Sequence, residues 1–202
     1  MKYLKMLGLA AVAAMALTAF LGAGSASAQT LWTYTTPSAN TGIATGTELV
    51  STLETGTSAL LQDTLGGVND TCTGSEVKGA ISTNTTTDAG GAISALTFTG
   101  CSHTTTVLAK GELELKNIAG TTNGTVISKG ARVTVKSTIF GVSCVANTGT
   151  GTTIGTLTGA KSHTANATMD INGVITLENG CGDSTWTGSY LVTSPAGLTV
   201  DS

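Results

Sequence analysis

Two histidines are the side chains of this chain best suited to acid/base or metal chemistry. His103 and His163 each lie in the same triplet, Ser-His-Thr. A shared metal ion or an acid/base pair needs a carboxylate or a cysteine at ligand spacing beside the imidazole, and neither histidine has one in the sequence. We interpret both as polar residues of threonine-rich turns.

Motifs for nucleophilic catalysis and phosphate binding are incomplete. The sequence has no Gly-x-Ser-x-Gly pentapeptide, which presents the nucleophile in many serine hydrolases. The glycine-rich run 149–155 lacks the Lys-Ser/Thr of a phosphate loop. We therefore expect a non-enzymatic protein with no catalytic residue, no metal site and no cofactor.

The first 28 residues have the pattern of an export signal. Lys2 and Lys5 form a short basic start, residues 6–21 carry no charge, and 26–28 supply the small residues that a signal peptidase requires. The apolar run is shorter than the roughly 18 residues of a membrane span. We expect 1–28 to be a cleaved signal peptide and 29–202 to be a single β-rich domain. The protein would then be secreted, periplasmic or at the cell surface, with no transmembrane segment after cleavage.

Four cysteines follow the predicted signal, at positions 72, 101, 144 and 181. In an oxidising compartment they favour two disulfides over a metal site, and no Cys-x-x-Cys pair occurs. Three pairings are open. We favour sequence neighbours, Cys72 with Cys101 and Cys144 with Cys181, because each would close a loop that contains a predicted hairpin.

Charge and composition restrict the class of partner. Without residues 1–28 the chain keeps seven basic and twelve acidic residues, a net charge of −5, and the basic ones are spread singly from Lys78 to Lys161. Nucleic-acid binding requires clustered lysine and arginine, so we expect no nucleic-acid partner. Threonine makes up about a fifth of the chain and there are 27 glycines. Threonine favours strands and glycine favours turns and bulges.

Period-two alternation of apolar and polar residues recurs along the chain. It is clear in 112–116, in 131–136 and in 165–172, and it is typical of strands with one face on a core. Asn172-Gly173 then precedes a further apolar run, 174–177, and predicts a hairpin turn because Asn-Gly suits the positive φ angles of a type I′ turn.

Other turn signals divide the remaining chain. Asn123-Gly124 predicts a second hairpin, 54–57 is expected to join two strands in the same way, and 88–91 is expected to separate two more. An amphipathic helical pair over 47–65 is the alternative for that region. Turn signals every 8 to 12 residues predict eleven to thirteen short strands. We expect an all-β, disulfide-stapled antiparallel β-sandwich of Greek-key or jelly-roll type, with a partly closed β-barrel as the alternative.

Aromatic residues are few, and three are candidate ligand contacts: Trp32, Trp186 and Tyr190. Trp186 and Tyr190 share one face of a predicted strand. The two tryptophans belong either to the core or an edge, or to an exposed ligand platform.

Six stretches span most of the chain after residue 28: Thr-Pro-Ser at 36–38 and the segments 70–75, 96–101, 119–125, 167–172 and 186–195. They resemble a group of small, threonine- and glycine-rich secreted bacterial proteins without an established activity. More distantly, the export signal, the β-rich body with cysteines and the Thr-Ser-Pro-x-x-Leu ending at 193–198 are similar to secreted activators of alkane oxidation in pseudomonads. That similarity implies a hydrophobic ligand.

Together these features predict a secreted, non-enzymatic surface, matrix or interaction protein. Its expected partners are further copies of itself or a cell-surface or matrix component. The alternative is an extracellular binding module for a hydrophobic ligand, such as an alkane or lipid, or for a carbohydrate.

Overall fold

The structure is a computed structural model that describes residues 29–36, 39–63, 69–136, 141–178 and 180–200. The predicted export signal lies outside the described residues. The described residues form sixteen strands and no helix, so this part of the chain has no apolar helix of membrane-spanning length. In chain order the strands are β1 Leu31–Thr36, β2 Ala39–Gly42, β3 Glu48–Leu53, β4 Ala59–Asp63, β5 Asn69–Ala80, β6 Thr83–Asn84, β7 Asp88–Cys101, β8 Thr104–Ala109, β9 Glu112–Asn117, β10 Asn123–Lys129, β11 Arg132–Lys136, β12 Ser143–Asn147, β13 Thr152–Thr158, β14 Ala167–Glu178, β15 Asp183–Ser194 and β16 Leu198–Val200.

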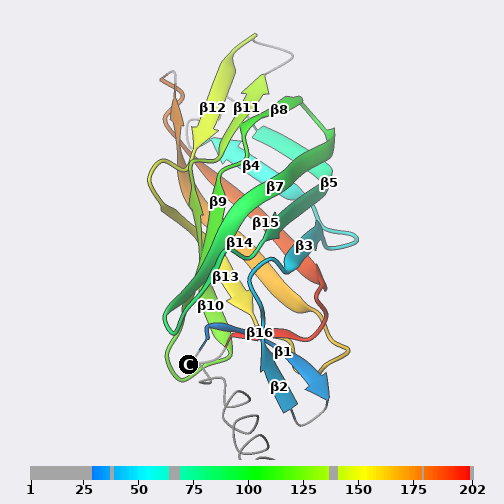
Figure 1. The fold of residues 1–202 in the computed structure, drawn as a ribbon. Helices are drawn as coiled ribbons and strands as arrows, with labels where there is room; N and C mark the ends of the chain where they lie inside the picture. Colours follow the sequence, from blue (N-terminus) through cyan, green and yellow to red (C-terminus); the bar gives the residue numbers. More distant parts are fainter. Residues whose placement is uncertain (1–28, 37–38, 64–68, 137–140, 179, 201–202) are drawn as a thin grey trace, which may run out of the picture.

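Eight strand positions close into an antiparallel β-barrel (Figure 1). Seven are β5, β7, β9, β10, β13, β14 and β15, and the eighth is shared by β3 and β4, which both pair with β15 on one side and β5 on the other. The expected sandwich is therefore not confirmed, and the barrel alternative is. Regular turn spacing does not distinguish a sandwich from a barrel, because barrel closure depends on which distant strands pair with each other.

The linker between β3 and β4 is not a hairpin turn. β3 and β4 do not pair with each other; they follow one another along the same gap between β15 and β5. A short turn joins them, closed by the Thr57 N–H donating to the Glu54 carbonyl at 3.0 Å. The predicted hairpin is wrong here, and so is the helical alternative for 47–65.

β14 shows the predicted alternation, with Met169, Ile171 and Ile175 buried and Asp170 and Asn172 exposed. It changes partner along its length. Its first half pairs with β13, and its last residues pair with β12. β12 in turn pairs with β11, and β11 pairs with β8, so these three strands form a branch of the sheet. This branch forms the upper end of the barrel in Figure 1.

The Asn172-Gly173 turn is wrong, because β14 runs through both residues. Gly173 meets another need of the fold. A Cβ atom at Gly173 would lie 2.6 Å from the Cα of Ile154 on β13, so only glycine lets the two backbones approach this closely. The β9–β10 hairpin is present, but its turn lies at 118–122, before Asn123-Gly124.

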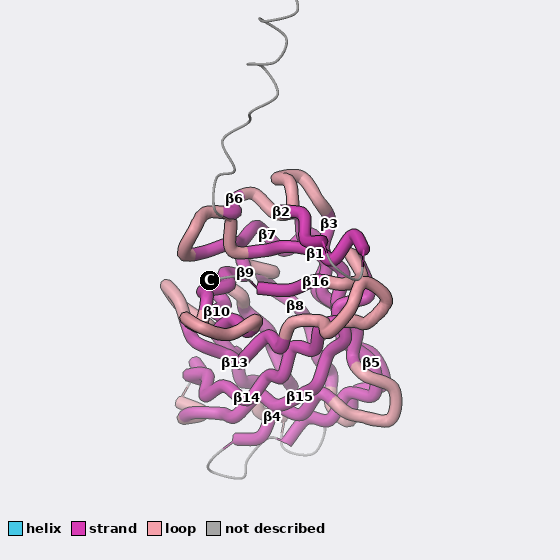
Figure 2. Tube along the Cα trace, turned by 90° about the horizontal axis from the view of Figure 1, so that it is seen from below, coloured by secondary structure: helices cyan, strands magenta, loops and turns pink. Residues whose placement is uncertain are grey.

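A small sheet closes the lower end of the barrel. β1 pairs with β2 and β16, and Figure 2 shows β1 and β16 crossing this end. Leu31, Leu198 and Val200 are almost fully buried there, because their side chains fill the bottom of the interior. We call this β1–β2–β16 sheet the plug.

Asn84 on β6 ties the plug to the barrel. Its Oδ1 accepts hydrogen bonds from the N–H groups of Thr30 (3.0 Å) and Leu31 (2.9 Å). Its Nδ2 donates to the carbonyls of Leu31 (3.0 Å) and Ile43 (2.9 Å). One side chain thus satisfies four backbone groups at the junction.

Two disulfides are present, as predicted, and they join sequence neighbours. Cys72 on β5 is bonded to Cys101, the directly opposite residue of β7. Cys144 on β12 is bonded to Cys181, which follows β14. The first therefore reinforces two barrel strands, and the second fastens the branch to the barrel.

Candidate functional site

Three apolar cavities lie in a row inside the barrel, and we name them by the end of the barrel that each is near, the plug marking the lower end in Figure 1. The lower cavity, next to the plug, has a volume of about 60 Å³, the middle one about 20 Å³ and the upper one about 40 Å³. The lower and middle cavities share Val77, Ile93, Leu113 and Met169 as lining residues, and the middle and upper cavities share Trp186. Neighbouring cavities are therefore adjacent, and the shared side chains lie between them.

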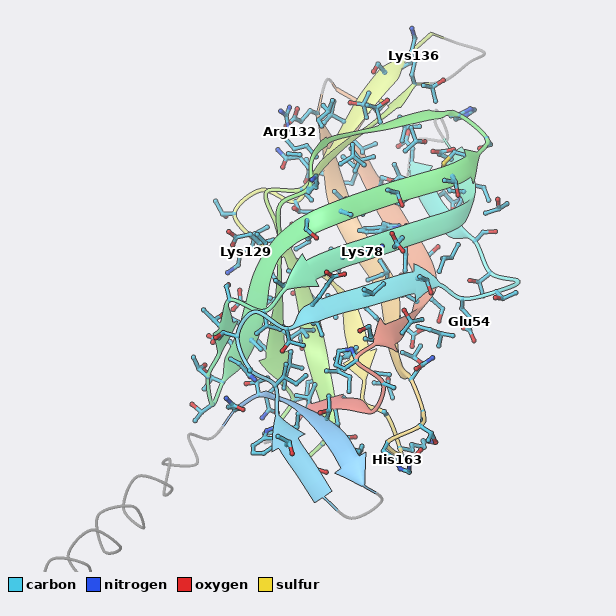
Figure 3. The ribbon with its side chains drawn as sticks, turned by 45° about the vertical axis from the view of Figure 1, so that its right-hand side comes forward. Glu54, Lys78, Lys129, Arg132, Lys136 and His163 are labelled. Atoms are coloured by element: carbon cyan, nitrogen blue, oxygen red, sulfur yellow. A yellow bond between two sulfur atoms is a disulfide. The ribbon has the colours of Figure 1, made fainter. Side chains whose placement is uncertain are left out.

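The lower cavity contains one inward hydroxyl, that of Ser51 on β3. Ser51 is 9% exposed and lines this cavity. Lys78 also borders this cavity, but its ammonium lies 3.0 Å from Glu76 and its side chain is 36% exposed. Figure 3 shows Lys78 on the outer side of the sheet. The cavity thus combines an apolar wall with a single polar group.

The middle cavity borders a buried tyrosine. The Tyr190 hydroxyl donates to the Ser75 Oγ at 3.1 Å, and Tyr190 is 1% exposed. Burial raises the pKa of Tyr190 to about 12, despite the opposing hydrogen bonds with Ser75 and Trp186. The phenol is therefore neutral at ordinary pH.

The upper cavity combines two aromatic rings with a buried carboxylate. Trp186 on β15 and Phe98 on β7 both line it and meet edge to face. Asp70 on β5 lines the same cavity and is 2% exposed. The remaining walls are mainly aliphatic residues of β4, β11, β12 and β14.

Three donors, two in the β7–β8 turn and one on β8, hold the Asp70 carboxylate. Its Oδ1 accepts from the Ser102 hydroxyl at 3.1 Å and from the His103 backbone N–H at 2.9 Å. Its Oδ2 accepts from the Thr105 hydroxyl. Because these donors lie on the turn between β7 and β8 and at the start of β8, Asp70 fixes the path of the chain at the upper cavity.

The Asp70 carboxylate also lies close to the sulfurs of Cys72 and Cys101, a grouping that would resemble a metal site if the cysteines were thiolates. The sulfurs are bonded to each other. A disulfide sulfur is not a thiolate ligand, so these residues do not fit a zinc or other soft-metal centre.

β7 and β8 leave two strand edges without a partner among the described residues. β7 pairs with β9 only up to Ala92, and β8 pairs only with β11. The two segments are joined by the turn at Ser102 and, at the other end, by the Ile93 N–H donating to Gly111 at 2.9 Å. We call this unit the open hairpin. Phe98 and Thr105 place it beside the upper cavity.

The structure separates the residues singled out from the sequence. Trp186 and Tyr190 both line the row of cavities, whereas half-buried Trp32 lies on β1 in the plug. His103 lies in the open hairpin, and His163 lies near the plug, as Figure 3 shows. The two histidines are therefore at opposite ends of the barrel.

Sequence reasoning missed Asp70, Phe98 and Ser51 as lining residues. The signal for Asp70 was available: it stands two residues before Cys72, so in a strand both face the same side. A cysteine expected to be buried in a disulfide therefore implied a buried carboxylate beside it. No such signal exists for Ser51, because threonine and serine occur on both faces of these strands.

The chain matches no protein-family model, no curated protein and no solved structure. The resemblance to small secreted bacterial proteins therefore stays a prediction.

Proposed function

We propose that this chain is a secreted, non-enzymatic binding module that holds a small apolar molecule inside its barrel. The observation that carries the proposal is the row of three apolar cavities through the interior. An eight-stranded barrel has room for side chains or for one small ligand, and ligand sites are typically apolar with a few polar groups. Ser51 and Asp70 would be those polar groups.

The size of the cavities favours a narrow ligand. The lower cavity, at about 60 Å³, is smaller than the roughly 150 Å³ that accommodates a benzene ring in an engineered apolar cavity. A single alkyl chain along the row would need the side chains between the cavities to move apart, because the middle cavity holds only about 20 Å³. Met169 borders both the lower and middle cavities, and its flexible thioether can move to join them.

A carbohydrate is the less favoured ligand. Sugars bind to exposed aromatic faces flanked by hydrogen-bonding groups, whereas Trp186 faces an apolar interior. Trp32 donates its indole N–H to the Gln29 carbonyl, which engages the one polar atom that its ring could offer a sugar.

Tryptophan fluorescence tests the proposal. In a Trp32→Phe variant, Trp186 is the only tryptophan, and added 1-decanol should change its emission and raise the unfolding temperature by several degrees. Ala131→Leu, which fills the middle cavity, should weaken both effects. Thr176→Leu introduces the same residue on the exposed face of β14 and should leave them unchanged. The proposal fails if decanol alters neither fluorescence nor unfolding temperature.

The open hairpin supports a second candidate function, that of a surface or matrix protein that associates through strand edges. β8 carries no charged residue, and Leu108 on it is 53% exposed. Proteins usually protect such edges with lysine, proline or short strands. If the edge mediates self-association, light scattering should show concentration-dependent assembly, and Thr106→Lys should abolish it. A monomer at every concentration contradicts this second function.

A further inference from the structure

Asp70 places a buried negative charge in the upper cavity without a cationic partner among the described residues. It is 2% exposed, and none of the four ion pairs of the described chain includes it. Buried carboxylates are normally paired with a base or a metal because desolvation of an isolated charge is costly. The three donors that hold Asp70 are neutral groups.

The Asp70 carboxylate keeps acceptor capacity on the oxygen bonded to Thr105. A carboxylate offers about four lone-pair positions, and two donors use Oδ1 while one uses Oδ2. The Cys72 sulfur, 3.7 Å from Oδ2, belongs to a disulfide and has no proton to donate. Oδ2 therefore keeps a lone-pair position for a further hydrogen bond, and Asp70 lines the upper cavity.

The aromatic residues of the upper cavity favour the same kind of ligand. Trp186 and Phe98 line it together with Asp70, and a cation gains energy from the face of an aromatic ring. Apart from Asp70, the only charged residue that lines the three cavities is Lys78, and Glu76 neutralises its ammonium at the outer surface. The charge inside the barrel is thus negative and lies at the upper end.

We infer that the barrel binds a linear alkylammonium compound, with its ammonium group hydrogen-bonded to Asp70 beside Trp186 and its alkyl chain displacing the side chains that separate the upper cavity from the middle and lower ones. This inference rests on the proposed function and names its ligand class. An ammonium supplies the missing positive charge and donates to Oδ2. A fatty acid of equal length would place a second carboxylate against Asp70, and like charges at that distance repel strongly in a poorly solvated site.

Three ligands with the same ten-carbon chain test the inference on the unmodified protein: decylamine, 1-decanol and decanoate. Calorimetric titration below their micelle concentrations should give decylamine about tenfold tighter binding than decanol, and decanoate the weakest binding. If decanol binds as tightly as decylamine, the ammonium inference is wrong while the proposed function stands. If none of the three binds, the proposed function itself fails.

Two matched variants assign the effect to Asp70. Asp70→Asn removes the charge but keeps one carbonyl oxygen for the donors of the open hairpin, so it should lower decylamine affinity to that of decanol and leave decanol unchanged. Asp170→Asn removes an exposed charge on β14 and should leave both affinities as they are. An equal loss of decylamine binding in the two variants would mean that the amine adsorbs to the acidic surface. The ligand series does not depend on how well Asp70→Asn folds.

Discussion

Trp186 and Phe98 meet edge to face across the interior, with ring centroids 6.1 Å apart and planes at 64°. They belong to β15 and β7, which are not neighbours in the barrel, because β3 or β4 and then β5 lie between them. Trp186 packs against both groups of buried apolar residues, the larger one near the plug and the smaller one around Cys144. The aromatic contact therefore joins two non-adjacent walls where the two parts of the core meet.

Replacing Phe98 should weaken the barrel at this contact. A fully buried phenylalanine costs about 3–5 kcal/mol when changed to alanine; because Phe98 is half-buried, we expect Phe98→Ala to lower the free energy of unfolding by about 2 kcal/mol, as measured by urea denaturation. Leu108→Ala, at a 53% exposed position on β8, is the control and should change it by less than about 0.5 kcal/mol. Equal effects would contradict the bridging role of Phe98.

The hydrogen bond between Tyr190 and Ser75 should also contribute to stability. Tyr190→Phe removes the hydroxyl and leaves the buried Ser75 Oγ without its donor, which should cost about 1–2 kcal/mol. Ser75→Ala and the double variant complete a double-mutant cycle, measured by urea denaturation. A coupling energy near zero would show that the two hydroxyls act independently.

Asn84 should be among the least replaceable polar residues. Asn84→Ala leaves two N–H groups and two carbonyls at the plug junction without partners, and each buried unsatisfied group costs about 1–3 kcal/mol unless water reaches it. We expect a loss of at least about 3 kcal/mol and faster amide hydrogen exchange at Leu31 and Ile43.

Asn84→Asp is a sharper control for the Asn84 network. It keeps the acceptor for Thr30 and Leu31 but replaces the amide donor with an oxygen that faces two carbonyls. It should therefore destabilise the junction as well, and Thr83→Ala, at the exposed neighbouring position, should not. If the exchange rates of the plug stay unchanged in Asn84→Ala, the junction does not depend on this side chain.

Gly173 should tolerate no side chain despite its place inside a strand. A glycine in a strand is normally improved by alanine, but here the new Cβ would lie 2.6 Å from the Ile154 Cα, so backbone must move. We expect Gly173→Ala to cost about 2 kcal/mol or more in thermal or urea unfolding. Asn172→Ala, at the exposed neighbour, should have little effect. A stabilised Gly173→Ala variant would contradict the close approach of β13 and β14.

Gly173 also shows where sequence reasoning ended. Alternation predicted the strand that contains Met169 and Ile171, because a strand with one buried face repeats every two residues. The preference of Asn-Gly for tight turns predicted a turn at Asn172-Gly173. That preference depends on local φ angles and takes no account of another strand that packs nearby. Glycines needed for close packing and glycines needed for turns are identical in sequence. The all-β class and the disulfides were therefore predictable, but the continuous β14 was not.

Barrel closure and the candidate site depend on contacts between distant segments. Ser51, Val77 and Leu198 come together only because β3, β5 and β16 meet at the lower cavity, and nothing in the local pattern specifies that meeting. Trp186 and Tyr190 could be proposed as ligand contacts because aromatic residues were few. Asp70 could have been proposed from its spacing to Cys72. Its lack of a basic partner among the described residues is visible only in the folded chain.

Glu178 should make stability depend on pH in the acid range. Arg132 Nη2 donates to its carboxylate at 2.6 Å and Asn147 Nδ2 at 2.7 Å. The hydrogen bond from Arg132, and after it that from Asn147, lowers the pKa of Glu178 below its ordinary 4.5. Because the folded state holds the ionised form, this contribution is fully present above pH 4.5 and is lost as pH falls through the lowered pKa.

Comparison with Glu178→Gln isolates this contribution. At pH 7 the wild type should have the higher urea midpoint, and the difference should shrink as pH falls from about 5 to 2, because the protonated glutamate resembles glutamine. Glu48→Gln, at an exposed position outside the ion pairs of the described residues, should give no comparable pH-dependent difference. A gap between wild type and Glu178→Gln that stays constant down to pH 2 would mean that the residue acts through packing and not through its charge.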